Sequence, residues 1–181
     1  MSRMTISYDL GRRHDACAAT GEPLKPGDEF VACLADDPES DDLLRLDYSA
    51  KAWDEGARPD PPRAVFACWH AVVPEPGAKP GFAIDASSLT ALFEQLGDDE
   101  EANDPRRLAL RFVIALMLMR KKHLVFEGQA ERDGGTKVML LRERGTPPEH
   151  APVEVIDPQL DEDTLASVTE QLSRIIQVAD S

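Results

Sequence analysis

Residues 105–122 read PRRLALRFVIALMLMRKK, and this stretch decides the expected fold of the C-terminal half. Asp104, just before it, can accept a hydrogen bond from a helix N-terminus, and Pro105 suits the first helical position. From Phe112 to Met119 all eight residues are apolar. The cations at positions 120–122 complement the negative end of a helix dipole. The stretch predicts a central helix with protein on all sides.

The segments after this helix predict a small sheet and a closing helix. Strands are expected at 124–131 and 136–144, because Asp133-Gly134-Gly135 between them suits a tight hairpin turn. A third short strand is expected at 153–156. Asp161 then caps an amphipathic helix, whose apolar stripe comprises Leu165, Val168, Leu172, Ile175 and Ile176.

The segments before it predict another helix and a linker. Four apolar residues of 88–96 share one helical face, and Gly97 is expected to end that helix; the four are Leu89, Leu92, Phe93 and Leu96. Residues 98–104 form an acidic linker, and the Pro-rich residues 74–80 favour an extended connection.

The N-terminal part predicts a β-rich module. Residues 28–35 and 43–48 suggest a hairpin around the acidic loop 36–42, and a third strand is expected at 64–73. Ser49 can cap a short helix that runs through Trp53, which with Trp69 is expected in the core. The fold class is thus α+β: a β-rich module at 1–74, a linker at 75–86 and an α+β domain at 87–181.

Composition predicts a cytoplasmic protein with no membrane segment. The apolar run is far shorter than the ~20 residues of a membrane-spanning helix, and the first 14 residues lack the apolar core of a secretory signal. Three cysteines, at positions 17, 33 and 68, are too few and too odd a set for a disulfide framework. No feature specifies an oligomeric state.

Charge is distributed unevenly along the chain. The net charge is −14, which disfavours binding to nucleic acid. Residues 106–144 nevertheless carry ten cations and four anions, a net charge of +6. This basic region either meets acidic neighbours within the monomer or docks an acidic partner.

The familiar catalytic patterns are absent from the sequence. It has no G-x-S-x-G, no H-E-x-x-H, no phosphate-binding loop and no G-x-G-x-x-G. We therefore expect a non-catalytic protein that binds another protein. An active site built from distant residues would be sought first at His14, Cys17, Asp47, Tyr48, Cys68 and His70.

One set of residues has the chemistry of a metal site. His14-x-x-Cys17 and Cys68-x-His70 supply two imidazoles and two thiols, which tetrahedral zinc accepts. The first spacing suits a turn, and the second places both side chains on one face of a strand. A structural zinc ion held by these four residues is therefore an alternative to a protein without cofactors.

The N-terminal module also resembles a known type. Cys17-Ala-Ala-Thr20-Gly21, followed by Leu24, Pro26-Gly27 and Phe30, resembles the opening knuckle of zinc-ribbon and treble-clef modules, whose usual form is C-x-x-C-G. Thr20 stands where the second cysteine would be, so the resemblance implies a degenerate knuckle whose metal is lost or moved.

A second resemblance spans most of the chain. The knuckle-like residues, together with motifs in both halves, look like an uncharacterised family of acidic bacterial proteins for which no activity is known. The further motifs are Asp47-Tyr48-Ser49, Ala52-Trp53, Arg120-Lys121 and Val155-Ile156-Asp157-Pro158. This resemblance supports the architecture and implies no cofactor or site.

A nucleic-acid-binding alternative also follows from the pattern. Residues 88–144 would be two helices and a basic hairpin, as in winged-helix proteins. The recognition helix would then be 106–122, whose middle is too apolar to lie in a DNA groove.

Overall fold

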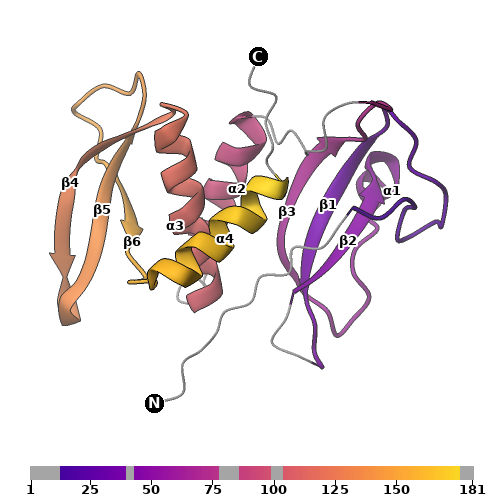
Figure 1. Cartoon of the computed structure of the whole chain (residues 1–181), viewed down its shortest axis with the longest axis horizontal. Helices are drawn as coiled ribbons and strands as arrows, with labels where there is room; N and C mark the ends of the chain where they lie inside the picture. The colour runs from indigo at the N-terminus through magenta and orange to yellow at the C-terminus, as the bar shows by residue number, and fades with distance from the viewer. Residues whose placement is uncertain (1–12, 40–42, 78–85, 99–103, 176–181) are drawn as a thin grey trace. The chain divides into compact units, whose positions relative to one another are not determined.

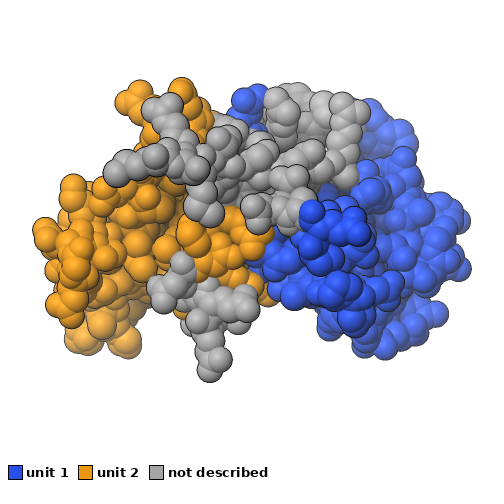
Figure 2. Space-filling model, turned by 90° about the horizontal axis from the view of Figure 1, so that it is seen from below, with its two compact units in different colours: residues 1–88, 169–181 blue, residues 89–168 orange. Residues whose placement is uncertain are grey.

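The computed structural model describes residues 13–39, 43–77, 86–98 and 104–175. These residues form an α+β fold with two three-stranded antiparallel sheets (Figure 1). The chain divides into two compact units, Met1–Ser88 with Thr169–Ser181 (unit 1) and Leu89–Val168 (unit 2), coloured separately in Figure 2. Most of the predicted linker at 75–86 lies outside the described residues, so its boundaries stay a prediction.

The sheet of unit 1 contains the predicted hairpin. Strands β1 (Glu29–Asp36) and β2 (Leu43–Ser49) pair antiparallel, and β3 (Val65–Val72) pairs with the other edge of β1, which gives the order β2-β1-β3. In β1, the stretch from Phe30 to Ala35 is buried, with at most 1% exposure per residue. A central strand covered on both faces is nearly continuously apolar, as this one is.

A short helix follows β2 as its cap residue predicts. The Ser49 hydroxyl accepts a hydrogen bond from the Ala52 amide at 3.2 Å, and α1 extends over Ala50–Asp54. Trp69 is 4% exposed and belongs to the core as expected. Trp53, also expected in the core, is only half-buried. Its ring centroid lies 5.4 Å from that of Tyr48 and 3.8 Å from the guanidinium carbon of Arg58.

Helix α2 (Ala86–Asp98), in which unit 2 begins, corrects the prediction that Gly97 ends this helix. The helix does not end at Gly97 but continues to Asp98. Gly97 has a different role: a Cβ atom at that position would lie 2.3 Å from Nη2 of Arg111. The absent side chain therefore makes room for a guanidinium on the neighbouring helix rather than for a change of backbone direction.

The central helix forms as predicted. Helix α3 covers Pro105–Arg120, with Pro105 in its first turn and the Asp104 carboxylate accepting from the Arg106 amide at 2.8 Å. No side chain from Phe112 to Met119 is exposed. Ile114 and Leu118 are at most 1% exposed, whereas Phe112 and Leu116 are half-buried. One face of α3 is therefore fully enclosed and the other only partly.

The second sheet also matches the prediction. Strands β4 (Leu124–Arg132), β5 (Thr136–Glu143) and β6 (Val153–Ile156) are arranged in the order β4-β5-β6, and Figure 1 shows α3 along one face. The connection between β4 and β5 is the turn Asp133–Gly135 (η1 in the element order), where φ is 78° at Gly134 and 80° at Gly135. These left-handed angles explain the Gly-Gly pair.

The closing helix α4 (Glu162–Ile175) begins where Asp161 predicts, since the Asp161 carboxylate accepts from the Thr164 amide at 2.7 Å. Val168 is 1% exposed and Leu165 is half-buried. The expected stripe positions Leu172, Ile175 and Ile176 fall outside the described side chains. Within the described residues, no helix is both long and apolar enough to cross a membrane.

Several cations of the basic region meet acidic partners within unit 2. Arg132 pairs with Glu154 across the sheet, and Arg142 pairs with Glu127. Hydrogen bonding within the second pair raises the pKa of Arg142 and lowers that of Glu127. Glu127 is already counted in the net charge of +6, whereas Glu154 lies outside residues 106–144, so its pairing with Arg132 compensates part of that charge.

Candidate functional site

The predicted metal ligands lie in two separate parts of unit 1, a segment before the first strand and strand β3. The segment that carries His14 and Cys17 packs on β2: the His14 amide donates to Oδ2 of Asp47 at 2.6 Å, and the Ser49 amide donates to Sγ of Cys17 at 3.3 Å. Cys68 and His70 lie on β3, two positions apart and so on one face, as their spacing predicts.

Strand β1 separates these two pairs. In the order β2-β1-β3, the outer strands are roughly 10 Å apart, whereas zinc ligands lie within about 2.3 Å of one metal. Among the residues that the structure describes, no three His, Cys, Asp or Glu side chains form a group that could hold a metal ion. The four predicted ligands are thus not brought together.

Cys17 instead occupies a hydrogen-bonded turn. Its backbone amide donates to the Glu22 carbonyl at 2.8 Å, and the Gly21 amide donates to the Cys17 carbonyl at 2.8 Å. Burial acts to raise the pKa of the Cys17 thiol, but hydrogen bonds from Ser49, Thr20 and Ala19 outweigh it and lower that pKa to about 7. Amide donors around sulfur favour the thiolate.

This thiol predicts a specific pH dependence of stability. Between pH 7 and pH 9 the folded state binds fewer protons than the unfolded state, so stability rises with pH and is lost as pH falls through 7. Relative to Cys17→Ser, the wild type is expected to gain up to roughly 2–3 kcal/mol across this range, measured by urea unfolding. Thr20→Val removes one hydrogen-bond donor to the Cys17 sulfur, so it should raise the pKa of Cys17 and with it the pH at which stability begins to rise. Parallel pH profiles of wild type and Cys17→Ser would contradict this account.

The Cys33 thiol and the Tyr48 phenol of unit 1 have raised pKa values because they are buried. Cys33 is fully buried and faces Cys68 in the β1–β3 register. Burial, and then the charge of Cys68, raise the pKa of Cys33 to about 12. Burial likewise raises the pKa of Tyr48 to about 12. Because Asp47 and Tyr48 are consecutive in β2, they face opposite sides of the sheet and do not converge.

Sequence reasoning missed the most unusual polar feature of unit 1. Arg45 and Asp47 form an ion pair at 3.1 Å, with side-chain exposures of 1% and 0%. The Arg45 guanidinium also lies over the Trp69 ring, with its carbon 5.6 Å from the centroid. The R-x-D alternation of β2 places both side chains on one face. Nothing in the sequence indicates that this face is covered.

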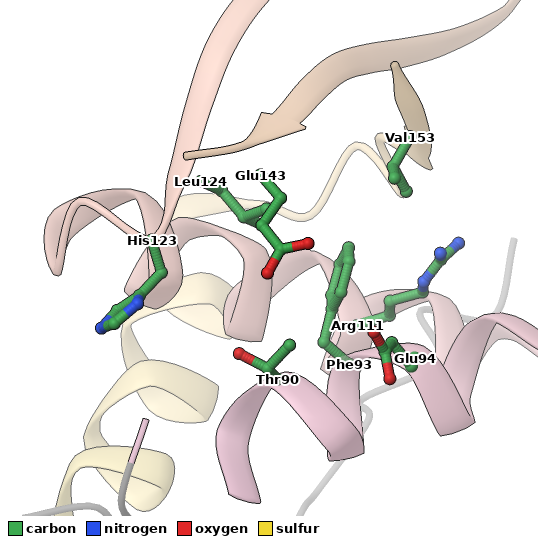
Figure 3. Close-up of a pocket in the computed structure, with 8 residues that line it drawn as sticks. All are labelled: Thr90, Phe93, Glu94, Arg111, His123, Leu124, Glu143 and Val153. Carbon is green, nitrogen blue, oxygen red and sulfur yellow. The ribbon is translucent and has the colours of Figure 1, made fainter. Parts of the chain in front are cut away.

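Unit 2 contains a pocket of about 170 Å³ (Figure 3). One wall comes from the helices: α2 supplies Thr90, Phe93 and Glu94, and α3 supplies Arg111. The Arg111 guanidinium carbon lies 4.8 Å from the Phe93 ring centroid, and its Nη1 donates to the Glu154 carbonyl at 3.3 Å. Arg111 therefore connects α2, α3 and β6 and fixes this wall.

The opposite wall comes from the sheet. His123, Leu124, Glu143 and Val153 contribute to it. Leu124 and Glu143 face each other in the β4–β5 register, so they project from one face of the sheet. In Figure 3 the Glu143 carboxylate and Thr90 hydroxyl lie on opposite sides of the pocket, whereas the Arg111 guanidinium lies beyond the Phe93 ring.

Phe126 and Leu141 extend the surface of the sheet that lines the pocket. Leu141 pairs with Phe126 on one side and Val153 on the other, so all three share a face. We call this the pocket face; it carries Leu124, Phe126, Leu141, Glu143 and Val153. Phe126 is 46% exposed and Val153 38%, although Leu141 between them is fully buried. The pocket thus opens beside exposed apolar groups.

The comparisons with known proteins give no further guidance. No protein-family model, curated protein or solved structure matches this chain. The resemblance to an acidic bacterial family therefore stays a prediction.

Proposed function

We propose that this chain is a non-catalytic protein-interaction or adaptor protein, which binds a segment of another protein at the pocket face of unit 2. The proposal rests on one observation: Phe126 and Val153 are left exposed beside a pocket of about 170 Å³. Pockets for drug-sized ligands measure roughly 300–1,000 Å³. This one has the size of a single side chain.

The surroundings of the pocket support a protein ligand. Aromatic side chains are enriched at the centres of protein interfaces. Exposed apolar groups that lie together next to polar ones are typical of interaction sites. A partner segment that crosses Phe126 could insert one side chain between α2 and the sheet, with Phe93 and Leu124 as apolar walls.

Two alternatives are less well supported. A zinc-stabilised module needs ligands that the described part of unit 1 does not group together. A winged-helix protein needs a recognition helix that presents side chains to a groove, but α3 exposes none between Phe112 and Met119. Neither has an observation in its favour comparable to the pocket.

A matched pair of variants tests the proposal. Phe126 and its neighbour Val125 are 46% and 48% exposed but project from opposite faces of β4. In affinity capture of partners by the tagged full chain from its own cells, Phe126→Ser should reduce recovery of a stoichiometric partner about tenfold. Val125→Ser should leave recovery unchanged.

Two results would refute the proposal. One is equal recovery by both variants, and the other is no stoichiometric partner at either low or moderate salt. Circular dichroism of both variants checks that a loss of recovery does not come from unfolding.

A further inference from the structure

Two cysteines of unit 1 lie directly opposite each other on adjacent strands. Cys33 on β1 is the antiparallel partner of Cys68 on β3, the strand beside it in Figure 1. The Val73 amide donates to the Asp28 carbonyl at 2.9 Å, which extends the β1–β3 ladder by a hydrogen-bonded pair. The two types of pair alternate along antiparallel strands, and the register is regular as far as Leu34. Cys33 and Cys68, an odd number of positions further along, therefore form a non-hydrogen-bonded pair.

This type of pair has the spacing that a disulfide requires. Non-hydrogen-bonded partners have Cα atoms about 4.5 Å apart, and their side chains leave the same face of the sheet. Disulfides bridge Cα separations of roughly 4.4–6.8 Å. The charge of Cys68 also helps to raise the pKa of Cys33, as expected of neighbouring sulfur atoms. A bond between these two cysteines therefore needs little movement of the strands.

Cys17, the remaining cysteine, lies away from this pair. Its sulfur accepts the Ser49 amide at 3.3 Å, and Ser49 pairs with Phe30 on the edge of β1 that faces away from β3. Strand β1 thus separates Cys17 from Cys68. Within the sheet, the cysteine opposite Cys33 is Cys68 and not Cys17.

The two opposed thiols differ in their access to solvent. Cys68 is half-buried, whereas Cys33 is 0% exposed and donates to the Leu34 carbonyl at 3.6 Å. Burial raises the pKa of Cys33 to about 12, so its thiolate is scarce at neutral pH. A small-molecule reagent therefore meets Cys68 first, and Cys33 lies where it can react with the product.

We propose that Cys33 and Cys68 are a redox-sensitive modification site, which forms a reversible cross-strand disulfide by exchange with a small-molecule disulfide such as oxidised glutathione. The Cys68 thiolate attacks one sulfur of oxidised glutathione, which forms a mixed disulfide and releases one glutathione thiolate. Cys33 then gives its proton to solvent and attacks the sulfur of Cys68, which releases the second glutathione thiolate. Two protein thiols are thus oxidised, and one glutathione disulfide is reduced to two thiols.

The bond fixes β3, an outer strand of the sheet, to the central strand β1. It closes the chain between the two cysteines into a loop, which removes conformations from the unfolded state and stabilises unit 1. A Cα separation at the lower end of the range for disulfides favours a bond that is readily reduced again. The pair therefore responds to the redox state of its surroundings. It belongs to unit 1 and does not rest on the proposed function of unit 2.

The test exposes the reduced full chain to mixtures of reduced and oxidised glutathione without denaturant, and then locates disulfides by alkylation, proteolysis and mass spectrometry. The disulfide between Cys33 and Cys68 should account for nearly all of the crosslinked protein, and reduced glutathione should reverse it. The melting temperature of the crosslinked chain should exceed that of the reduced chain by roughly 5–15 °C. In concentrated urea the preference should invert, because the loop between Cys17 and Cys33 is shorter and closes about threefold more often.

Three serine variants separate the steps of the exchange. Cys33→Ser should stop at a mixed disulfide on Cys68, and Cys68→Ser should give neither a crosslink nor an adduct at Cys33. Cys17→Ser is the matched control, because it removes a thiol of the same unit that lies outside the pair. It should crosslink like the wild type. Circular dichroism checks that each variant is folded.

The proposal is overturned if Cys17 takes part in the main crosslink of the folded chain, or if glutathione stays on Cys68 without transfer to Cys33. A crosslinked chain that melts no higher than the reduced one would equally contradict it, because the bond would then not join strands that are paired in the native sheet. None of these outcomes bears on the pocket face, which the Phe126→Ser capture experiment tests by itself.

Discussion

Asp47→Ala is expected to destabilise the protein by about 3–5 kcal/mol, because it leaves the buried guanidinium of Arg45 without its carboxylate. The two side chains are 1% and 0% exposed, with both Nε and Nη2 of Arg45 donating to Oδ1 of Asp47 at 3.1 Å. The same carboxylate accepts the His14 amide at 2.6 Å. The substitution thus also removes one of the hydrogen bonds that hold the segment of His14 on β2.

Three further variants locate the source of this loss in urea unfolding experiments. Asp47→Asn retains the shape and removes the charge, and should lose most of the same stability. The double variant Arg45→Met, Asp47→Leu should recover most of it, since replacing both charges with apolar groups is often neutral. Lys51→Ala breaks the exposed pair Lys51–Glu55, whose side chains are 85% and 67% exposed, and should cost at most about 0.5 kcal/mol. A loss for Asp47→Ala no larger than that for Lys51→Ala would show that the pair is not buried in solution.

Local signals explain why so many elements could be predicted. Asp104, Ser49 and Asp161 each accept the hydrogen bond of an N-cap, and a cap depends only on residues within one turn. The turn at Asp133–Gly135 is equally local, because its left-handed angles demand glycine. Such features depend on sequence neighbours, so the sequence alone reveals them.

Features that depend on distant segments were missed. Gly97 has the residue type of a helix stop, but its environment is set by Arg111 on another helix. The spacing of Cys68 and His70 correctly predicts that they lie on one face of a strand. The strand order, which puts β1 between them and Cys17, cannot be predicted from that spacing. The pocket likewise combines residues of α2, α3 and three strands, and no single stretch carries its pattern.

The uneven burial of α3 gives the second large expected effect. The sequence predicts a helix enclosed on all sides, but only one face is fully enclosed. Leu118 is 1% exposed, whereas Leu116 on the same helix is half-buried. Deleting the same atoms from both positions therefore compares the two faces with no difference in residue type or helix propensity.

Leu118→Ala is expected to cost about 3–5 kcal/mol, the range for a leucine whose removal leaves a cavity in a closely packed core. Leu116→Ala should cost roughly 1–2 kcal/mol, since less apolar surface returns to water and solvent can fill part of the space. Urea unfolding with a common slope for both variants provides the measurement. Equal losses of more than about 3 kcal/mol would mean that α3 is enclosed all round, as its sequence alone suggests. Equal losses below about 1 kcal/mol would instead show that α3 does not lie in the core. It could then not provide the rigid wall that positions Arg111 at the pocket.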